Sequence, residues 1–390
     1  DGSTITLSQD RFLYTEGDEP DTTIWSVPIV MKVGTESGVD EVRYLLEESS
    51  AEIKLDSPAI WASANAGGGG FFRARYSPEM LKALSSSMFD NLTPIERYGL
   101  VDDTWSSVMA GRTSASDFLD FARSFQAETD LDVWTVLSGC LAGMDKLVEG
   151  EAKEQYRAAV RDLAQPALDR LGWEPSDSDS SRDLELRGLF VRLLANVGDD
   201  ELAIKNAGDL HDSYLRDAGS VEPNIAAAAT GVVASKGGSA EYDVFLDKHQ
   251  NPATPQEERR YQSALSAFPG ADEMNRTLAM AMDGTIRTQD APYLLAVCMR
   301  NKEQGYLAWE FIKDNWDKIN KDFPSNSIVR MLSGVTSLSK PGQADDVFAF
   351  FDENEVPQGH LTLQQTLEKL RVNVALRERE RGPFSESLTK

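Results

Sequence analysis

Helix start signals recur along most of this sequence, and they constrain its fold more than any other feature. The first is Ser77-Pro78-Glu79, a serine N-cap followed by proline, whose fixed φ suits the first helical turn. Comparable starts lie at Thr93-Pro94-Ile95-Glu96, Ser114-Ala115-Ser116-Asp117, Thr254-Pro255-Gln256-Glu257 and Phe323-Pro324-Ser325, with expected stops at Gly111, Gly172, Gly198, Gly219 and Gly270. The pattern predicts roughly 15 helices after residue 76.

The spacing of these helices indicates how they pack. A helix pair takes roughly 40 residues, which is the repeat length of helical solenoids of the HEAT and armadillo type. The sequence therefore predicts an α–α superhelix for residues 77–390. Solenoids of this kind use a concave surface to bind extended partners.

Residues 1–76 have a different character. Thr4–Leu7, Trp25–Val33, Val42–Leu46 and Ala51–Leu55 are short, rich in β-branched residues and separated by turn residues, as expected for strands. We expect a further strand at residues 71–76, with Phe71, Arg73 and Arg75 on one face. These strands predict a small N-terminal β-sandwich, so the chain is expected to be multidomain and mainly α, with domains at 1–76 and 77–390.

A glycine run, Gly67–Gly70, precedes the last expected strand. A phosphate-binding loop is one interpretation, but the run lacks the Gly-Lys-Ser/Thr ending and does not lead into a helix. A flexible hairpin turn is the interpretation that the pattern favours.

Composition excludes several classes of function. The net charge of −25 makes binding to the phosphate backbone of nucleic acid unfavourable. No apolar run approaches the roughly 20 residues that span a bilayer, so no membrane partner is expected. Cys140 and Cys298 lie in apolar helical patterns and are interpreted as buried unpaired thiols. Such sparse cysteine suits a reducing compartment, and we expect a cytoplasmic protein.

No residue pattern indicates catalysis by this chain. His211, His249 and His360 are far apart in sequence and none belongs to a metal-ligand spacing, so each is interpreted as a solvated histidine at a helix end. Nucleophile elbows and dinucleotide or phosphate fingerprints are absent. We therefore assign no catalytic residue, no metal ligand and no cofactor to this chain.

One segment, residues 300–316, combines an exposed charge with an aromatic helix. From Tyr306 onward the apolar residues recur at spacings of three and four, and Trp309 and Trp316 fall on nearly the same stripe. This helix must be packed between neighbours. Arg300 ends the preceding helix. It either caps that helix's free carbonyls or points into a binding cavity.

Several motifs, in this order, resemble the C-terminal half of the gluzincin zinc aminopeptidases, a family that includes aminopeptidase N, puromycin-sensitive aminopeptidase and the endoplasmic-reticulum aminopeptidases. The motifs are Gln9-Asp10-Arg11-Phe12-Leu13, Trp25-Ser26-Val27-Pro28-Ile29, Asn65 with Gly70-Phe71-Phe72-Arg73-Ala74-Arg75-Tyr76, Arg97-Tyr98-Gly99-Leu100-Val101-Asp102-Asp103 with Gly111, Arg300-Asn301 through Trp316, and Gln364-Gln365-Thr366-Leu367-Glu368. Together they cover nearly the whole chain.

The resemblance implies that catalysis belongs to other domains. In that family an N-terminal domain and a thermolysin-like domain come first, and the second carries the zinc motif His-Glu-x-x-His and the Gly-x-Met-Glu-Asn sequence that binds the substrate's free amine. Neither motif occurs in this sequence. The chain starts at Asp1 with a strand-like segment, so we expect a piece of a longer polypeptide whose upstream catalytic domain holds the zinc.

The implied role of this part is to close the peptide chamber and to contribute to substrate access and length selection. Its expected partners are peptide substrates and the missing domains, and it should be inactive alone. Arg300 becomes the candidate peptide-binding residue, because a guanidinium pairs well with a peptide's C-terminal carboxylate. Arg73 and Arg75 are expected to face either the absent catalytic domain or solvent. The alternative is a free-standing helical-repeat scaffold that binds protein or peptide partners.

Overall fold

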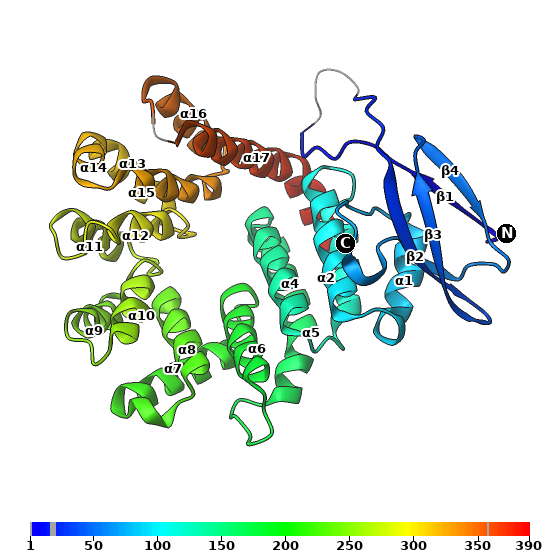
Figure 1. Cartoon of the computed structure of the whole chain (residues 1–390). Coiled ribbons are helices and arrows are strands. Elements are labelled where there is room, and N and C mark those ends of the chain that lie inside the picture. The colour runs from blue at the N-terminus through cyan, green and yellow to red at the C-terminus, as the bar shows by residue number, and fades with distance from the viewer. Residues whose placement is uncertain (1, 16–20, 357–358) are drawn as a thin grey trace. The chain divides into compact units, whose positions relative to one another are not determined.

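The computed structural model of the protein describes residues 2–15, 21–356 and 359–390 (Figure 1). It forms two compact units. Unit 1 comprises Asp1–Tyr156 together with Arg379–Lys390, and unit 2 comprises Arg157–Glu378. The boundary between the units falls inside two long helices, so it does not test the predicted domain boundary after Tyr76, which stays a prediction.

The N-terminal strands form two small antiparallel sheets in unit 1. The strands are β1 (Thr4–Ser8), β2 (Val27–Thr35), β3 (Gly38–Leu46), β4 (Ser50–Lys54) and β5 (Trp61–Ser63). β1 pairs with β4, and the second sheet has the order β3-β2-β5. Ile29, Met31 and Val33 of β2 are buried in one cluster with Ile5 and Ile53 of the other sheet. Alternate apolar residues therefore bring the two sheets onto a shared core, as expected for a small sandwich.

Helices follow from Pro78 onward. They are α1 (Pro78–Asn91), α2 (Pro94–Met109), α3 (Ala115–Ala122), α4 (Leu131–Met144), α5 (Gly150–Leu171), α6 (Ser181–Arg192), α7 (Glu201–Arg216), α8 (Pro223–Lys236), α9 (Ser239–Gln250), α10 (Pro255–Leu265), α11 (Ala271–Met282), α12 (Ala291–Cys298), α13 (Gly305–Asp314), α14 (Trp316–Asp322), α15 (Ser325–Met331), α16 (Gln343–Glu353) and α17 (His360–Leu388). The expected mainly α chain with a small N-terminal β region is confirmed. No helix in the described ranges is both long and apolar enough to cross a membrane.

Capping explains where several helices begin. Ser77 accepts a hydrogen bond from the Met80 amide, and Thr254 accepts one from the Glu257 amide, as their N-cap positions predict. Gly172 follows α5 with a φ of 72°, the left-handed conformation typical of a helix stop. Gly270 was expected to stop a helix, and this prediction is wrong. It is the N-cap of α11 and has an extended backbone.

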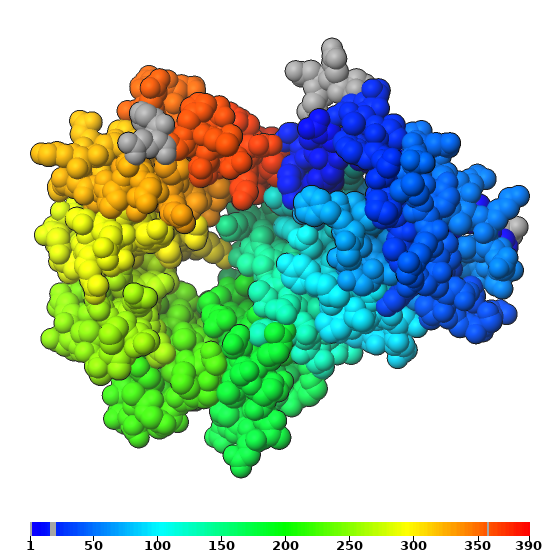
Figure 2. All heavy atoms as spheres, in the orientation of Figure 1, coloured from blue at the N-terminus to red at the C-terminus, as the bar shows by residue number. Residues whose placement is uncertain are grey.

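Unit 2 is built in two layers of helices. α6, α8, α10, α12 and α15 contact one another in succession, and α7, α9 and α11 pack against this row from one side (Figure 1). The space-filling view shows the successive colours from yellow to orange abutting within this unit (Figure 2). The buried aromatic and aliphatic side chains of α9 to α17 form one continuous cluster. Such stacking is the arrangement that the spacing of helix signals predicts, and its assignment to the HEAT type stays a prediction.

Two local predictions for residues 66–76 are wrong. Ala66–Gly68 form a 3₁₀ turn in place of a hairpin, and residues 71–76 form no strand. The predicted alternation is nevertheless present, since Phe71, Arg73 and Arg75 are exposed and the residues between them are half-buried. Side chains of α2, rather than a neighbouring strand, bind this segment.

Candidate functional site

Arg300, the predicted binding residue, lies just beyond the end of α12 and is exposed. Its Nη2 atom donates a hydrogen bond of 2.9 Å to the Ser333 hydroxyl on the 3₁₀ segment Leu332–Ser337. Among the described residues, no hydrogen bond joins the guanidinium to a carbonyl of α12, so Arg300 does not cap that helix. One edge of the guanidinium is fixed by Ser333, and its other donors are available to an anion.

Asn301 fixes the turn that carries Arg300. Its Nδ2 donates 2.9 Å hydrogen bonds to the carbonyls of Ser266 and Phe268. Its Oδ1 accepts the amides of Glu303 and Gln304, both at 2.9 Å. All of the hydrogen-bonding capacity of this amide side chain is used within the protein, and the turn is held to the preceding α10–α11 connection.

The aromatic helix after this turn is structural. Trp309 and Trp316 pack edge to face with Phe350 of α16, as the prediction of a helix packed between neighbours requires. The predicted single helix is wrong, because it breaks at Asn315 into α13 and α14. The Asn315 side chain and the Asn315 amide both donate to the Phe311 carbonyl, at 2.8 Å and 3.1 Å, where α13 ends.

An ion pair holds the same helix to α16. The Asp346 carboxylate accepts hydrogen bonds from the Trp309 Nε1 and the Lys313 ammonium, at 2.7 Å and 2.6 Å. Burial alone would raise the pKa of Asp346, but these hydrogen bonds hold it below its ordinary value. The carboxylate is therefore charged at neutral pH and serves packing rather than chemistry.

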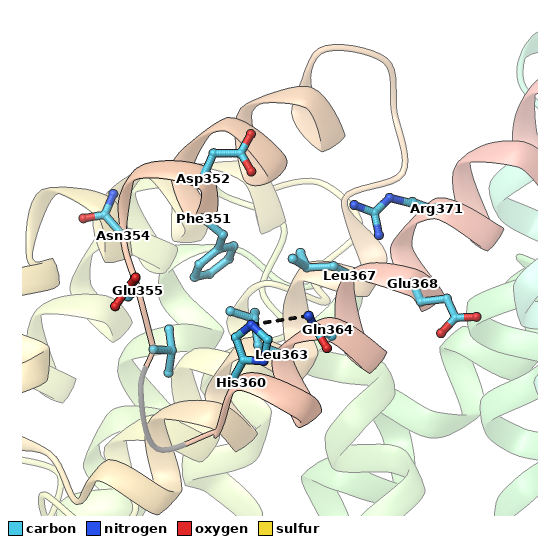
Figure 3. A pocket seen from close by; sticks show the side chains of 11 residues that line it. Phe351, Asp352, Asn354, Glu355, His360, Leu363, Gln364, Leu367, Glu368 and Arg371 are labelled. Carbon is cyan, nitrogen blue, oxygen red and sulfur yellow. Dashed lines mark hydrogen bonds between the residues drawn. The ribbon is translucent and has the colours of Figure 1, made fainter.

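A pocket of about 740 Å³ lies between α16 and the first turns of α17 (Figure 3). Figure 3 shows the Phe351 ring pointing from α16 toward Leu363 of α17. The lining residues are Phe351, Asp352, Asn354, Glu355, Val356, His360, Leu363, Gln364, Leu367, Glu368 and Arg371. The lining combines four apolar side chains with three carboxylates and one guanidinium, a mixture that suits a ligand with both apolar and charged groups.

The pocket contains part of a sequence motif but not the predicted site residue. Gln364, Leu367 and Glu368 line it, whereas Arg300 does not. Sequence reasoning missed His360 and Arg371, which also line it. The signal was present, since residues 360, 363, 364, 367, 368 and 371 recur at helical spacing and fall on one face of α17.

The two arginines of the β region are placed differently from each other. The Arg73 guanidinium binds Asp102 at 2.7 Å and lies 5.3 Å from the centre of the Phe12 ring, and the residue nevertheless stays exposed, so its two predicted orientations stay open. Arg75 is exposed, and no described residue pairs with it. Its two predicted orientations therefore stay open.

The buried histidines correct another expectation. His211 is 3% exposed, and its Nε2 lies 3.2 Å from the Tyr261 hydroxyl; His249 is also buried. Burial lowers the pKa of His211 to about 4. These two residues are core histidines, not solvated ones, and only His360 is exposed. Cys140 and Cys298 are free and buried, as predicted.

In the described part of the chain, no group of three or more histidine, cysteine or acidic side chains is arranged to hold a metal ion. Arg300 and the α16–α17 pocket are two places in unit 2 whose chemistry suits a ligand. An exposed guanidinium suits a carboxylate or phosphate, and a pocket that combines apolar side chains with three carboxylates suits an apolar or cationic side chain.

Comparison with known proteins places the chain in a family. Residues 61–372 match the model of the ERAP1-like C-terminal domain. Among similar curated proteins, Aminopeptidase M1 of Arabidopsis thaliana is 28% identical over 95% of this chain and 44% of its own length. Puromycin-sensitive aminopeptidase of Caenorhabditis elegans is 28% identical over 80% of this chain and 34% of its own length. Endoplasmic reticulum aminopeptidase 2 of Homo sapiens is 25% identical over 96% and 40%.

The chain thus spans less than half the length of these relatives. The family model covers most of the chain, including both the helical array and the end of the β region. The resemblance to the C-terminal region of an aminopeptidase is confirmed, and the chain belongs to the family of the ERAP1-like C-terminal domain.

Proposed function

We propose that this chain is the non-catalytic C-terminal part of a zinc-dependent aminopeptidase that removes N-terminal residues from peptides. The observation that carries the proposal is the match to the ERAP1-like C-terminal domain together with the partial coverage of relatives named as aminopeptidases. The His-Glu-x-x-His motif is absent from the sequence, so zinc and catalysis belong to another part of the polypeptide. The reducing compartment suggested by the two free cysteines makes the cytoplasm its proposed location.

Within that enzyme, the helical part closes the peptide chamber and helps to select substrates by length. Arg300 binds the C-terminal carboxylate of a long peptide. This role is supported by its exposure and by the Ser333 hydroxyl, which orients the guanidinium and leaves donors free. A carboxylate with two hydrogen bonds to a guanidinium is a strong, geometrically specific pair.

Measurement of the native polypeptide tests the main proposal. An antibody against this chain should detect in its source a polypeptide longer than 390 residues, and the immunoprecipitate should hydrolyse aminoacyl-naphthylamides in a chelator-sensitive manner. The purified chain itself should hydrolyse none. A native polypeptide of only 43.0 kDa would instead favour the free-standing scaffold.

Substitution of Arg300 tests its role in the full-length enzyme. Arg300→Ala should raise KM for long peptides by about tenfold, the value of one charge-assisted pair, and leave aminoacyl-naphthylamide hydrolysis unchanged. Arg287→Ala is the matched control, because Arg287 is also an exposed arginine of unit 2 but already pairs with Glu258. Equal effects of Arg300→Ala on long and short substrates would contradict the proposed role.

A further inference from the structure

The glycine loop before α1, Gly67–Gly70, is held by side chains of Asn65 and α2. The Asn65 side chain accepts the Gly70 amide at 2.8 Å and donates to the Gly70 carbonyl at 3.1 Å. The buried Glu96 of α2 accepts the Gly67 amide at 2.7 Å. Gly67 has a φ of 69°, a conformation that suits glycine. The loop is thus a preformed turn rather than a flexible connection.

The residues after the loop are fastened equally well. Arg73 binds Asp102, and the Ala74 amide donates a 3.0 Å hydrogen bond to Asp103. The Tyr76 hydroxyl accepts the amide of Ala64 at 2.9 Å. Since the loop is bound near the first turn of α2 and residues 73–74 are bound near Asp102 and Asp103, the segment runs along this helix.

Phe71 lies between these two attachments and is fully exposed. Two apolar residues of α2 are exposed on the same stretch, with Ile95 at 55% and Tyr98 at 36%. A Cβ atom at Gly68 would lie 3.1 Å from the Ile95 side chain, which places the glycine loop beside it. We call Phe71, Ile95, Tyr98 and Gly67–Gly69 the Phe71 surface.

A fully exposed phenylalanine on a rigid segment is unfavourable in water. Burying such a ring stabilises a protein by roughly 2 kcal/mol, and this chain forgoes that energy although the adjacent Phe72 packs into the β core. Exposed aromatic side chains on a fixed backbone are typical anchors of protein interfaces, because little backbone entropy is lost on binding. The glycine backbone beside Ile95 carries no side chain and allows close approach.

We propose that the Phe71 surface is the docking site for the remaining part of the same polypeptide. The relatives extend over more than twice the length that this chain matches, so most of each relative lies outside the region described here. Arg75 is exposed on the same side of the segment as Phe71, by alternation, and has no partner among the described residues. The partner surface therefore presents an apolar hollow for Phe71 with a carboxylate at its edge for Arg75. This inference rests on the proposed function.

Footprinting with hydroxyl radicals tests the docking. Phe71 should be labelled strongly in the 390-residue chain and at least fivefold less in the full-length polypeptide. Tyr293, an aromatic residue of unit 2 that is 47% exposed, is the control and should be labelled equally in both. Equal labelling of Phe71 in the two proteins would overturn the proposal. Protection of Phe71 in the isolated chain that grows with protein concentration would also overturn it, because the occupant would then be a second copy of the chain.

A variant pair provides a second readout. Phe71→Ser should leave the Tm of the 390-residue chain unchanged within about 1 °C, because the ring contributes no packing there. In the full-length polypeptide it should increase the rate of proteolytic cleavage between the two parts several-fold, and Tyr293→Ser should not. Absence of any longer polypeptide would defeat the proposed function and this inference together. A longer polypeptide whose cleavage ignores Phe71→Ser would defeat only the docking.

Discussion

The turn at Asn65 in unit 1 and the turn at Asn301 in unit 2 use the same device and display opposite groups. In each, an asparagine side chain both donates to and accepts from nearby backbone and so holds an irregular segment in one conformation. The first turn presents the apolar ring of Phe71. The second presents the guanidinium of Arg300.

The comparison separates two kinds of residue in these segments, those that stabilise the turn and those that the turn presents to a partner. The asparagine that fixes each turn forms hydrogen bonds inside the protein, four for Asn301 and two for Asn65, whereas the displayed residue contributes little to folding. Substitution of a fixing residue should therefore lower stability. Substitution of a displayed residue should change only an interaction with a partner.

The largest effect is expected at Asn301. Asn301→Ala removes four hydrogen bonds and leaves the carbonyls of Ser266 and Phe268 without their donor, so the free energy of unfolding should fall by about 3 kcal/mol. Denaturant unfolding followed by circular dichroism measures it. Asn320→Ala, which removes one half-buried hydrogen bond to the Trp316 carbonyl, is the control and should cost less than about 1 kcal/mol.

One buried group in each unit should make the free energy of unfolding depend on pH, and the two dependences should have opposite signs. Burial holds the pKa of His211 in unit 2 at about 4, so its neutral form stabilises the fold above pH 6.5, and this contribution is lost as pH falls toward 4. Between pH 7 and pH 5 the contribution of His211 to the free energy of unfolding should fall by about 2 kcal/mol. His211→Gln cannot gain a proton, and its unfolding free energy should fall less over the same range.

Asp103 of unit 1 should act in the opposite direction. Burial raises its pKa to about 6, against which the Ala74 amide and Arg73 only partly compensate. Its protonation favours the folded state below pH 6, and this stabilisation is lost as pH rises through 6. Acidification from pH 7 to 5 should therefore raise the contribution of Asp103 to the free energy of unfolding by about 1 kcal/mol. Asp103→Asn removes the titrating group, and a variant whose unfolding showed the same pH profile as the parent would contradict this assignment.

At Asn65 a smaller loss is expected than at Asn301, because only Gly70 is bound. Asn65→Ala should lower the free energy of unfolding by about 1.5 kcal/mol, measured by the same denaturant titration. A loss as large as that of Asn301→Ala would mean that the glycine loop also supports the β core.

The smallest effects are expected for the displayed residues. Arg300→Ala and Phe71→Ser should each change the free energy of unfolding of the isolated chain by less than about 0.5 kcal/mol. Differential scanning calorimetry of the two variants measures this. A loss of about 2 kcal/mol in either would show that the displayed side chain is part of the fold and would remove the distinction drawn between the turns.

Local sequence patterns predicted the secondary-structure elements better than they predicted the burial and contacts of individual side chains. Strand and helix positions followed from alternation and caps, and the aromatic stripe around Trp309 correctly indicated packing on a neighbour. The break at Asn315 was missed because no glycine or proline marks it in the sequence. The burial of His211 was missed because its neighbours, Phe245 and Tyr261, lie on other helices.

The candidate sites show the same limit. Alternation correctly placed Phe71, Arg73 and Arg75 on one side, but Arg73 pairs with a carboxylate about thirty positions away that no local pattern identifies. The partner of Arg300, Ser333, is equally distant. The face of α17 that lines the pocket was readable from spacing alone, yet the opposite wall is supplied by Phe351, which requires knowledge of how α16 and α17 pack.

Unit 1 is completed by residues from the far end of the sequence. Glu380 accepts the amide of Ala115, Arg379 donates to the Val108 carbonyl, and Phe384 packs on Tyr156. Ala115 is synthesised 265 residues before its partner Glu380. The part of unit 1 up to Tyr156 therefore lacks its contacts with α17 until unit 2 has been synthesised. Premature termination within α17 would leave Tyr156 without the Phe384 ring and expose apolar surface of unit 1 to chaperones and proteases.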